Sequence, residues 1–195
     1  MNDYHIVLGV VSSIIGFSSF FPYFRDILRG TTKPHPFTYF IWGLINAIAF
    51  FAQISAGGGP GSWVSGVVTL ECLAVALLAL RWGEKDITKL DWLCLMGAFM
   101  GIVLWRITNE PLTAIVFVTI TDGLAAIPTF RKSYWKPDEE TASSYVLGAL
   151  RSLIALPALT IFNFTTALYP AFVALVDIAL VALLLVRRKQ LKSTV

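Results

Sequence analysis

Seven apolar stretches, each of membrane-spanning length or nearly so, dominate this 195-residue sequence. A helix needs about 20 mostly apolar residues to cross the ~30 Å hydrocarbon core of a bilayer. The stretches cover residues 5–24, 37–56, 63–81, 91–106, 111–130, 142–162 and 167–186. The segments between them are too short to fold as separate domains. We therefore expect an all-α, polytopic membrane protein with seven transmembrane helices.

The composition supports this interpretation and argues against several other classes of protein. Charged residues make up 14% of the chain, hydrophobic residues 56%, and the mean hydropathy is +0.73. Soluble domains carry about 25% charged residues. The chain therefore has too few charged residues to be a water-soluble globular domain, a disordered tail or a nucleic-acid-binding module. The formal net charge of +3 is explained by basic loops, so we expect the lipid bilayer and no nucleic acid as a partner.

The basic residues fall on alternate loops and thereby predict the orientation of the chain. On one side lie thirteen of the fifteen lysines and arginines: Arg25, Arg29, Lys33, Arg81, Lys85, Lys89, Arg131, Lys132, Lys136, Arg187, Arg188, Lys189 and Lys192. Cytoplasmic loops carry the excess of Lys and Arg. The first stretch has no positive segment before it, so we expect a retained span. These features predict an N-terminus outside, a cytoplasmic C-terminus and a location in the plasma (inner) membrane.

An internal repeat appears when the sequence is shifted by 106 residues. Pro22 to Arg25 then aligns with Pro128 to Arg131, and residues 71–81 align with 177–187. Tyr39 falls on Tyr145 between these anchors. Transporters commonly use parallel repeats, with the solute path between them. We therefore expect one triple-helix repeat over residues 5–82, a linker helix over 90–107 and a second triple-helix repeat over 111–188.

This layout, with a proline and a basic loop at the end of the first and fifth spans, resembles the PQ-loop and SWEET transporter superfamily. The segments that carry the resemblance are residues 21–34 and 127–137. The resemblance implies a seven-helix fold of three, one and three spans, with a solute path between the two bundles. Tyr23 and Thr129 stand where the family has glutamine, so this sequence is a divergent member of that pattern.

The resemblance also implies that prolines act as hinges when the two bundles rock. Such prolines occur in the first, second, fifth and sixth spans of these transporters. Here the corresponding residues are Pro22, Pro128 and Pro157, whereas the core of the second span has none.

Acidic residues recur at repeat-equivalent positions inside the membrane. Glu71 and Asp177 each lie ten residues, or about 15 Å, before the basic residue that ends their span, which places them near the midplane. Two carboxylates facing one cavity repel each other and lose hydration, which favours binding of a cation or a proton. We expect both to contact solute; the alternative is that each is only a hydrogen-bonding group in helix packing.

Asp122 and Arg151 have no charged counterparts in the first repeat, where Gly16 and Ile45 stand. An acid and a base on neighbouring membrane helices are most simply interpreted as an intramembrane ion pair that holds the second bundle together. Direct contact with the solute is the alternative.

The second span carries polar and aromatic residues on one helical face, namely Tyr39, Trp42, Asn46 and Gln53, and its repeat counterpart contains Tyr145, Gly148 and Ser152. Such a face suits the wall of a binding cavity, where Trp stacks on a ligand and Asn donates and accepts hydrogen bonds. The alternative for the tyrosines is an aromatic belt at the membrane interface.

Together these features predict a transporter that moves a small polar or charged solute by alternating access, either as a facilitator or coupled to protons. A non-transporting membrane receptor or sensor that binds a small ligand in the same cavity is the alternative. We expect no enzymatic activity, because the sequence offers no nucleophile–base set, and no metal or other cofactor. A homo-oligomer is compatible with seven spans but is not required by them.

Overall fold

The computed structural model describes residues 3–30, 34, 36–83, 89–135, 137–139 and 142–192. Within these ranges all regular structure is helical, which confirms the all-α prediction. The elements are α1 (Asp3–Leu28), α2 (Pro36–Ser55), the 3-10 turn η1 (Gly59–Ser62), α3 (Trp63–Trp82), α4 (Lys89–Thr108), α5 (Pro111–Trp135), the 3-10 turn η2 (Pro137–Glu139), α6 (Ala142–Ala155) and α7 (Phe164–Lys192).

Several of these helices are suited to a membrane by length and composition. Among the described residues, four segments are long and apolar enough to cross one: Asp3–Arg25, Thr38–Ser55, Gly59–Trp82 and Phe164–Leu191. Shorter apolar stretches occur in the other helices: Leu95–Thr108, Pro111–Ile127 and Ala142–Ala155. The prediction of a membrane protein is therefore supported by the helices themselves.

The outer surface of α1 is apolar, whereas the exposed face of a helix in a soluble protein is polar. Val7, Ile14, Phe17 and Phe21 are each more than half exposed and recur along one face. The opposite face buries Ser12 and Ser19, and the Ser12 hydroxyl donates to the Arg151 carbonyl oxygen at 2.7 Å. Apolar residues facing outward and hydroxyls facing inward are typical of a helix whose surroundings are lipid.

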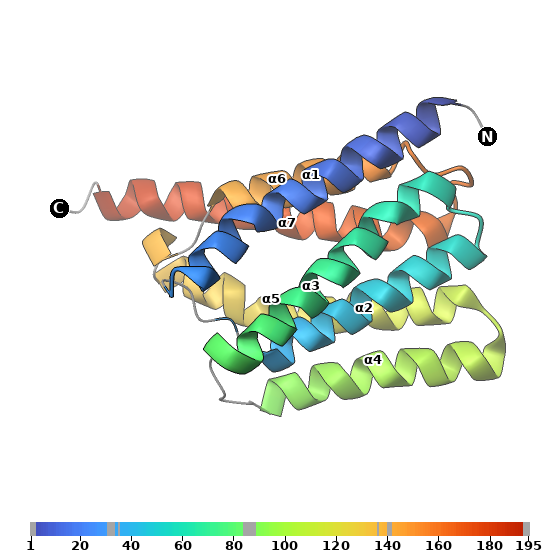
Figure 1. The fold of residues 1–195 in the computed structure, drawn as a ribbon, viewed down its shortest axis with the longest axis horizontal. Helices are drawn as coiled ribbons and strands as arrows, with labels where there is room; N and C mark the ends of the chain where they lie inside the picture. Colours follow the sequence, from blue (N-terminus) through green and yellow to red (C-terminus); the bar gives the residue numbers. More distant parts are fainter. Residues whose placement is uncertain are drawn as a thin grey trace.

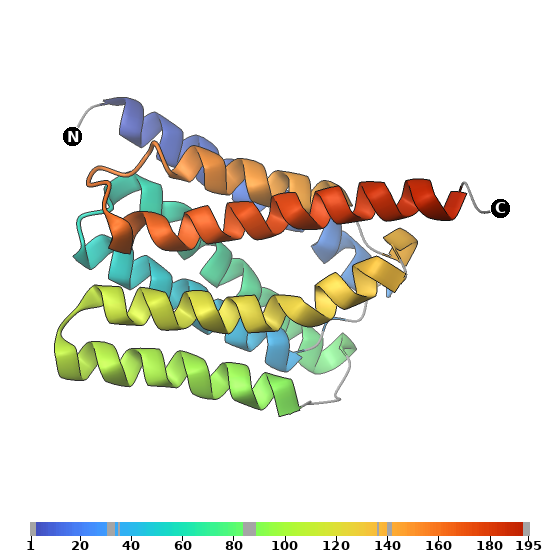
Figure 2. The ribbon, with the colours of Figure 1, turned by 180° about the vertical axis from the view of Figure 1, so that it is seen from behind.

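The helices before and after α4 pack in the same order. Helix α3 packs against both α1 and α2, and α7 packs against both α5 and α6. The two groups meet where α1 contacts α6 and where α2 contacts α5, while α4 lies against α5 and α2. Figures 1 and 2 show these helices running along the long axis, with the termini at opposite ends. We call α1–α3 the first half of the molecule and α5–α7 the second half.

The sixth predicted span, residues 142–162, is not one continuous helix, because α6 ends at Ala155. Pro157 follows two residues later, has no amide hydrogen and disfavours a helical conformation in the residue before it. The chain therefore turns, and Pro157 lies exposed outside the helix that it was expected to hinge.

The turn after α6 is tied to the turn after α2. The Thr160 and Ile161 amides donate to the Gly58 and Gly57 carbonyl oxygens at 3.0 and 3.2 Å, and the Gly61 amide donates to the Ala158 oxygen at 3.0 Å. Gly57 and Gly59 have φ of 80° and 60°, a conformation that glycine adopts without a steric cost. These bonds join the two halves at the end of the molecule that carries the N-terminus.

Candidate binding cavity between the two halves

A cavity of about 620 Å³ lies between the two halves and is lined by residues of α1, α2, α3, α5, α6 and α7. Sites for small organic ligands typically enclose ~300–1,000 Å³. On α2 and α6 the lining begins at Thr38 and Ser144, each two residues inside its helix. Both helices start at the end of the molecule where α1 and α3 finish (Figure 1), and Arg25 and Arg81 stand in the last turns of those helices, so the cavity lining extends toward this basic end.

The two halves line the cavity with corresponding positions on α2 and α6. Thr38, Tyr39, Trp42 and Asn46 line it from α2, and the residues 106 positions later are Ser144, Tyr145, Gly148 and Ser152, which line it from α6. On α1 and α5 the same shift relates Phe20 to Ala126 and Tyr23 to Thr129. The sequence repeat therefore coincides with the cavity wall over these four helices.

On α3 and α7 the shift that relates corresponding cavity positions is 105 residues instead of 106. Val64, Ser65, Val68 and Cys72 line the cavity from α3, and a shift of 105 places them on Tyr169, Pro170, Val173 and Asp177, which all line it from α7. The reason is that Asn46 precedes Val64 by 18 residues, whereas Ser152 precedes Tyr169 by 17. By cavity position, the counterpart of Asp177 is therefore Cys72.

This shift explains why Glu71 and Asp177 do not share the cavity. Asp177 is among the lining residues, whereas Glu71 is not; it is buried beside the cavity at 5% exposure. One residue is a rotation of about 100° on a helix, which turns Glu71 away from the lining face. Neither carboxylate oxygen of Glu71 has a hydrogen-bond partner among the described residues.

The structure brings together most of the other predicted site residues. The lining includes Pro22, Tyr39, Trp42, Asn46, Asp122, Tyr145, Arg151, Ser152 and Asp177. Pro128 lies in α5, but its side chain is outside the described part of the structure.

Asp122 and Arg151 both line the cavity but do not form the expected ion pair. In the described part of the chain, no nitrogen of Arg151 lies within 4.0 Å of an Asp122 oxygen. Their helices, α5 and α6, each pack on α7, so the two side chains approach the cavity from different walls. Asp122 instead has the buried Tyr169 as its hydrogen-bond partner.

Arg151 is the cation with which all three intramembrane acids interact electrostatically, namely Glu71, Asp122 and Asp177. Its side chain passes Gly16 of α1, where a methyl group would lie 3.7 Å from the Arg151 Cδ atom. One guanidinium nitrogen of Arg151 is buried and has no hydrogen-bond partner among the described residues. Arg151 thus supplies a positive charge to the cavity without being neutralised by a contact.

Aromatic rings form a continuous surface on the first half. The ring centroids of Tyr23 and Tyr39 are 5.5 Å apart, and those of Tyr39 and Trp42 are 5.3 Å apart in an edge-to-face arrangement. The Trp42 indole nitrogen is buried and has no partner within the described chain. The Asn46 amide donates to the Trp42 carbonyl oxygen at 3.0 Å, which fixes its orientation on the helix. We call Tyr23, Tyr39 and Trp42 the aromatic wall.

The Asp177 carboxylate packs directly against Gly148 of α6. A methyl group at position 148 would overlap the Oδ2 atom of Asp177. Glycine is therefore the residue that allows α6 and this acid to approach one another. At the corresponding position of the first half, Trp42 packs against the buried cluster that contains Cys72.

The sequence patterns missed Tyr169, Cys72 and Pro170 as lining residues. Tyr169 could have been found, because a buried acid such as Asp122 requires a hydrogen-bonding partner and Tyr169 lies eight residues before Asp177 on one helical face. Cys72 was hidden by the assumed shift of 106 residues. Pro170 is a proline inside α7 with no counterpart at that position of α3.

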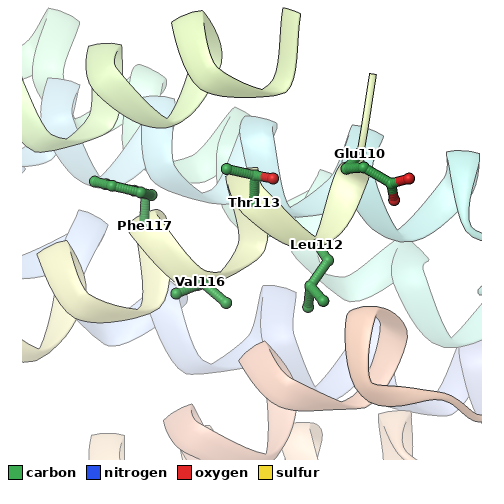
Figure 3. Close-up of a pocket in the computed structure, with 5 residues that line it drawn as sticks. All are labelled: Glu110, Leu112, Thr113, Val116 and Phe117. Atoms are coloured by element: carbon green, nitrogen blue, oxygen red, sulfur yellow. The ribbon is translucent and has the colours of Figure 1, made fainter. Parts of the chain in front are cut away.

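A second, smaller pocket lies elsewhere and has a different character. Its volume is about 330 Å³, and Figure 3 shows its lining side chains spread along the start of α5: Glu110, Leu112, Thr113, Val116 and Phe117. Polar groups from several elements do not converge there. Across the described residues, no group of three or more His, Cys, Asp or Glu side chains is placed to hold a metal ion.

Comparison of this chain with protein-family models, with curated proteins and with solved structures found no match.

Proposed function

We propose that this protein is a membrane transporter that moves a small polar or charged solute by alternating access between its two halves. In this proposal the chain crosses the membrane seven times, as three, one and three spans, with the N-terminus outside. The observation that carries the proposal is the cavity between the halves, which is lined at corresponding positions and contains Asp122, Arg151 and Asp177. Ionisable residues at membrane depth are costly and typically mark a solute or ion pathway.

The two ends of the molecule support one particular state of the transport cycle. The loops after α2 and α6 are joined by three backbone hydrogen bonds at one end, while the cavity lining reaches the basic end. In the proposed carrier, these bonds would hold the two halves together at the end that carries the N-terminus. With the N-terminus outside, the proposal assigns this structure to a state closed toward the outside.

The short helix α6 is compatible with a complete sixth span. Its 14 residues extend only about 21 Å, less than the ~30 Å core. Non-helical backbone is tolerated at membrane depth when its polar groups are satisfied within the protein. The amides of Thr160 and Ile161 meet this condition through Gly58 and Gly57, so α6 and the following turn together form the span.

Reconstitution into proteoliposomes tests the proposal. Uptake of labelled amines, amino acids and sugars is measured with and without an imposed pH gradient, which also separates a facilitator from a proton-coupled carrier. We expect saturable uptake of at least one solute that is lost in Arg151→Ala and retained in the surface control Glu110→Gln. Binding of a solute in the cavity without its release on the opposite side would contradict transport and favour the receptor function.

A further inference from the structure

The charges that line the cavity do not balance. Asp122 and Asp177 contribute two negative charges when ionised and Arg151 contributes one positive charge, which leaves an excess of one negative charge. Glu71, buried beside the cavity and interacting with Arg151, increases that excess when it is ionised. An uncompensated charge in a low-dielectric site is unfavourable, so the cavity favours either a bound proton or an occupant with one positive charge.

The aromatic wall indicates that this cation is organic. Tyr23, Tyr39 and Trp42 present contiguous rings to the cavity, with neighbouring centroids 5.3–5.5 Å apart. Aromatic faces attract ammonium groups and also pack against the apolar body of a ligand. A bare metal ion would instead be held by several ligating side chains, and the described residues include no group of three or more His, Cys, Asp or Glu side chains placed to hold one. The volume of about 620 Å³ also accommodates an organic molecule.

Asp177 is the acid best placed to meet the positive group. Asp122 already has Tyr169 as its partner, whereas no hydrogen bond of Asp177 to another described residue is observed. Gly148 lets the Asp177 carboxylate lie against α6, one helical turn from Tyr145. An ammonium group at Asp177 would therefore have aromatic residues of both halves within the same cavity.

We propose that the cavity binds a monovalent organic cation, with its ammonium group at Asp177 and its apolar body against the aromatic wall. This inference rests on the proposed function, because it names the class of solute that the transporter would carry.

Binding to the purified full-length protein in detergent tests the inference by calorimetry. The probes are two cations, 2-phenylethylamine and choline, and their neutral isosteres, 2-phenylethanol and 3,3-dimethylbutan-1-ol. Phenylalanine and 3-phenylpropionate serve as the zwitterion and the anion. We expect at least one cation to bind about tenfold or more tightly than its isostere, because only the cation neutralises the site. Equal or tighter binding of the isosteres, the zwitterion or the anion, or no binding of any probe, overturns the proposal.

The Asp177→Asn substitution locates the positive group. We expect the affinity for the cation to fall about tenfold and that for the neutral isostere to stay within about twofold. Glu110→Gln removes an exposed acid outside the cavity and serves as the matched control. If Asp177→Asn does not fold, Gly148→Ala displaces the same carboxylate and has the same expected effect. A preference for the cation that survives in both variants would contradict the placement at Asp177.

The uptake assay separates failure of this inference from failure of the proposed function. Cation binding without any transport would leave the inference intact and reject the transporter. Saturable transport of a neutral or anionic solute, with no preference for cations, would retain the transporter and reject the cationic solute.

Discussion

The two walls of the cavity use corresponding positions for different chemistry. The first half contributes the aromatic wall and no carboxylate or basic side chain to the described lining, whereas Asp122, Arg151 and Asp177 all come from the second half. The clearest exchange pairs Trp42 and Cys72 with Gly148 and Asp177. In the first half a large aromatic ring lies beside a small thiol. In the second half a glycine, which has no side chain, lies beside a carboxylate. Two similar backbones can thus supply one wall of a site with aromatic rings and the other wall with charged groups.

The strongest test of this division is to place an acid in the aromatic half. Cys72→Asp would put a carboxylate into a site that is 1% exposed and packed by Trp42, and we expect a loss of stability of about 3 kcal/mol or more. The reciprocal Asp177→Cys should fold, because it removes a charge from a partly exposed position. Thermal unfolding in detergent measures both. Equal stability of the two variants would contradict the division between the halves.

A second test concerns the end at which the halves are joined. A methyl group at Gly61 would lie 2.6 Å from the Ala155 carbonyl oxygen and the Leu159 amide nitrogen, so Gly61→Ala should cost about 1–3 kcal/mol. The matched control is Gly66→Ala in α3, where the methyl group meets only the Phe50 ring at 3.3 Å and helix propensity improves by up to about 1 kcal/mol. We expect a lower unfolding temperature for the first variant and no decrease for the second. If both variants unfold at the same temperature, the backbone contact between the loops is not tight.

The contribution of the aromatic wall is tested through Trp42→Ala. We expect the affinity for 2-phenylethylamine to fall about tenfold, because stacking and cation–π contact together contribute about 1–2 kcal/mol. Trp92→Ala, on the exposed surface of α4, is the control and should leave affinity unchanged. Equal affinity of both variants would show that the wall only packs and does not bind.

The smallest expected effect distinguishes a shift of 106 residues between α3 and α7 from a shift of 105 residues. If Glu71 were the counterpart of Asp177 in the cavity, Glu71→Gln would weaken cation binding as much as Asp177→Asn. Because Glu71 lies outside the lining and acts on an occupant only from a distance, we expect the affinity to fall by about threefold at most, less than in Asp177→Asn. Calorimetry of the two single variants, side by side, provides the measurement. A tenfold loss in Glu71→Gln would restore the shift of 106 residues.

Much of this architecture was predictable from local sequence. Hydropathy located the helices, because apolar segments of this length have few alternatives, and helical spacing identified Tyr39, Trp42 and Asn46 as one face of α2. The rotation of α3 was not predictable, since it depends on segment 46–64 being one residue longer than segment 152–169, in which α6 ends early. A hydroxyl partner for Asp122 was predictable, because a buried acid needs a hydrogen bond, but spacing along one helix does not say which neighbouring helix supplies it.

The one-residue difference between the connecting segments 46–64 and 152–169 has a consequence for how such a site diversifies. Inserting or deleting a single residue in a loop turns the following helix by about 100° and presents a new set of side chains without altering any of them. In this chain that rotation exchanges Glu71 for Cys72 at the cavity wall. Under the proposed function, the length of a connecting segment would thus help to determine specificity, because it selects which face of the next helix lines the cavity.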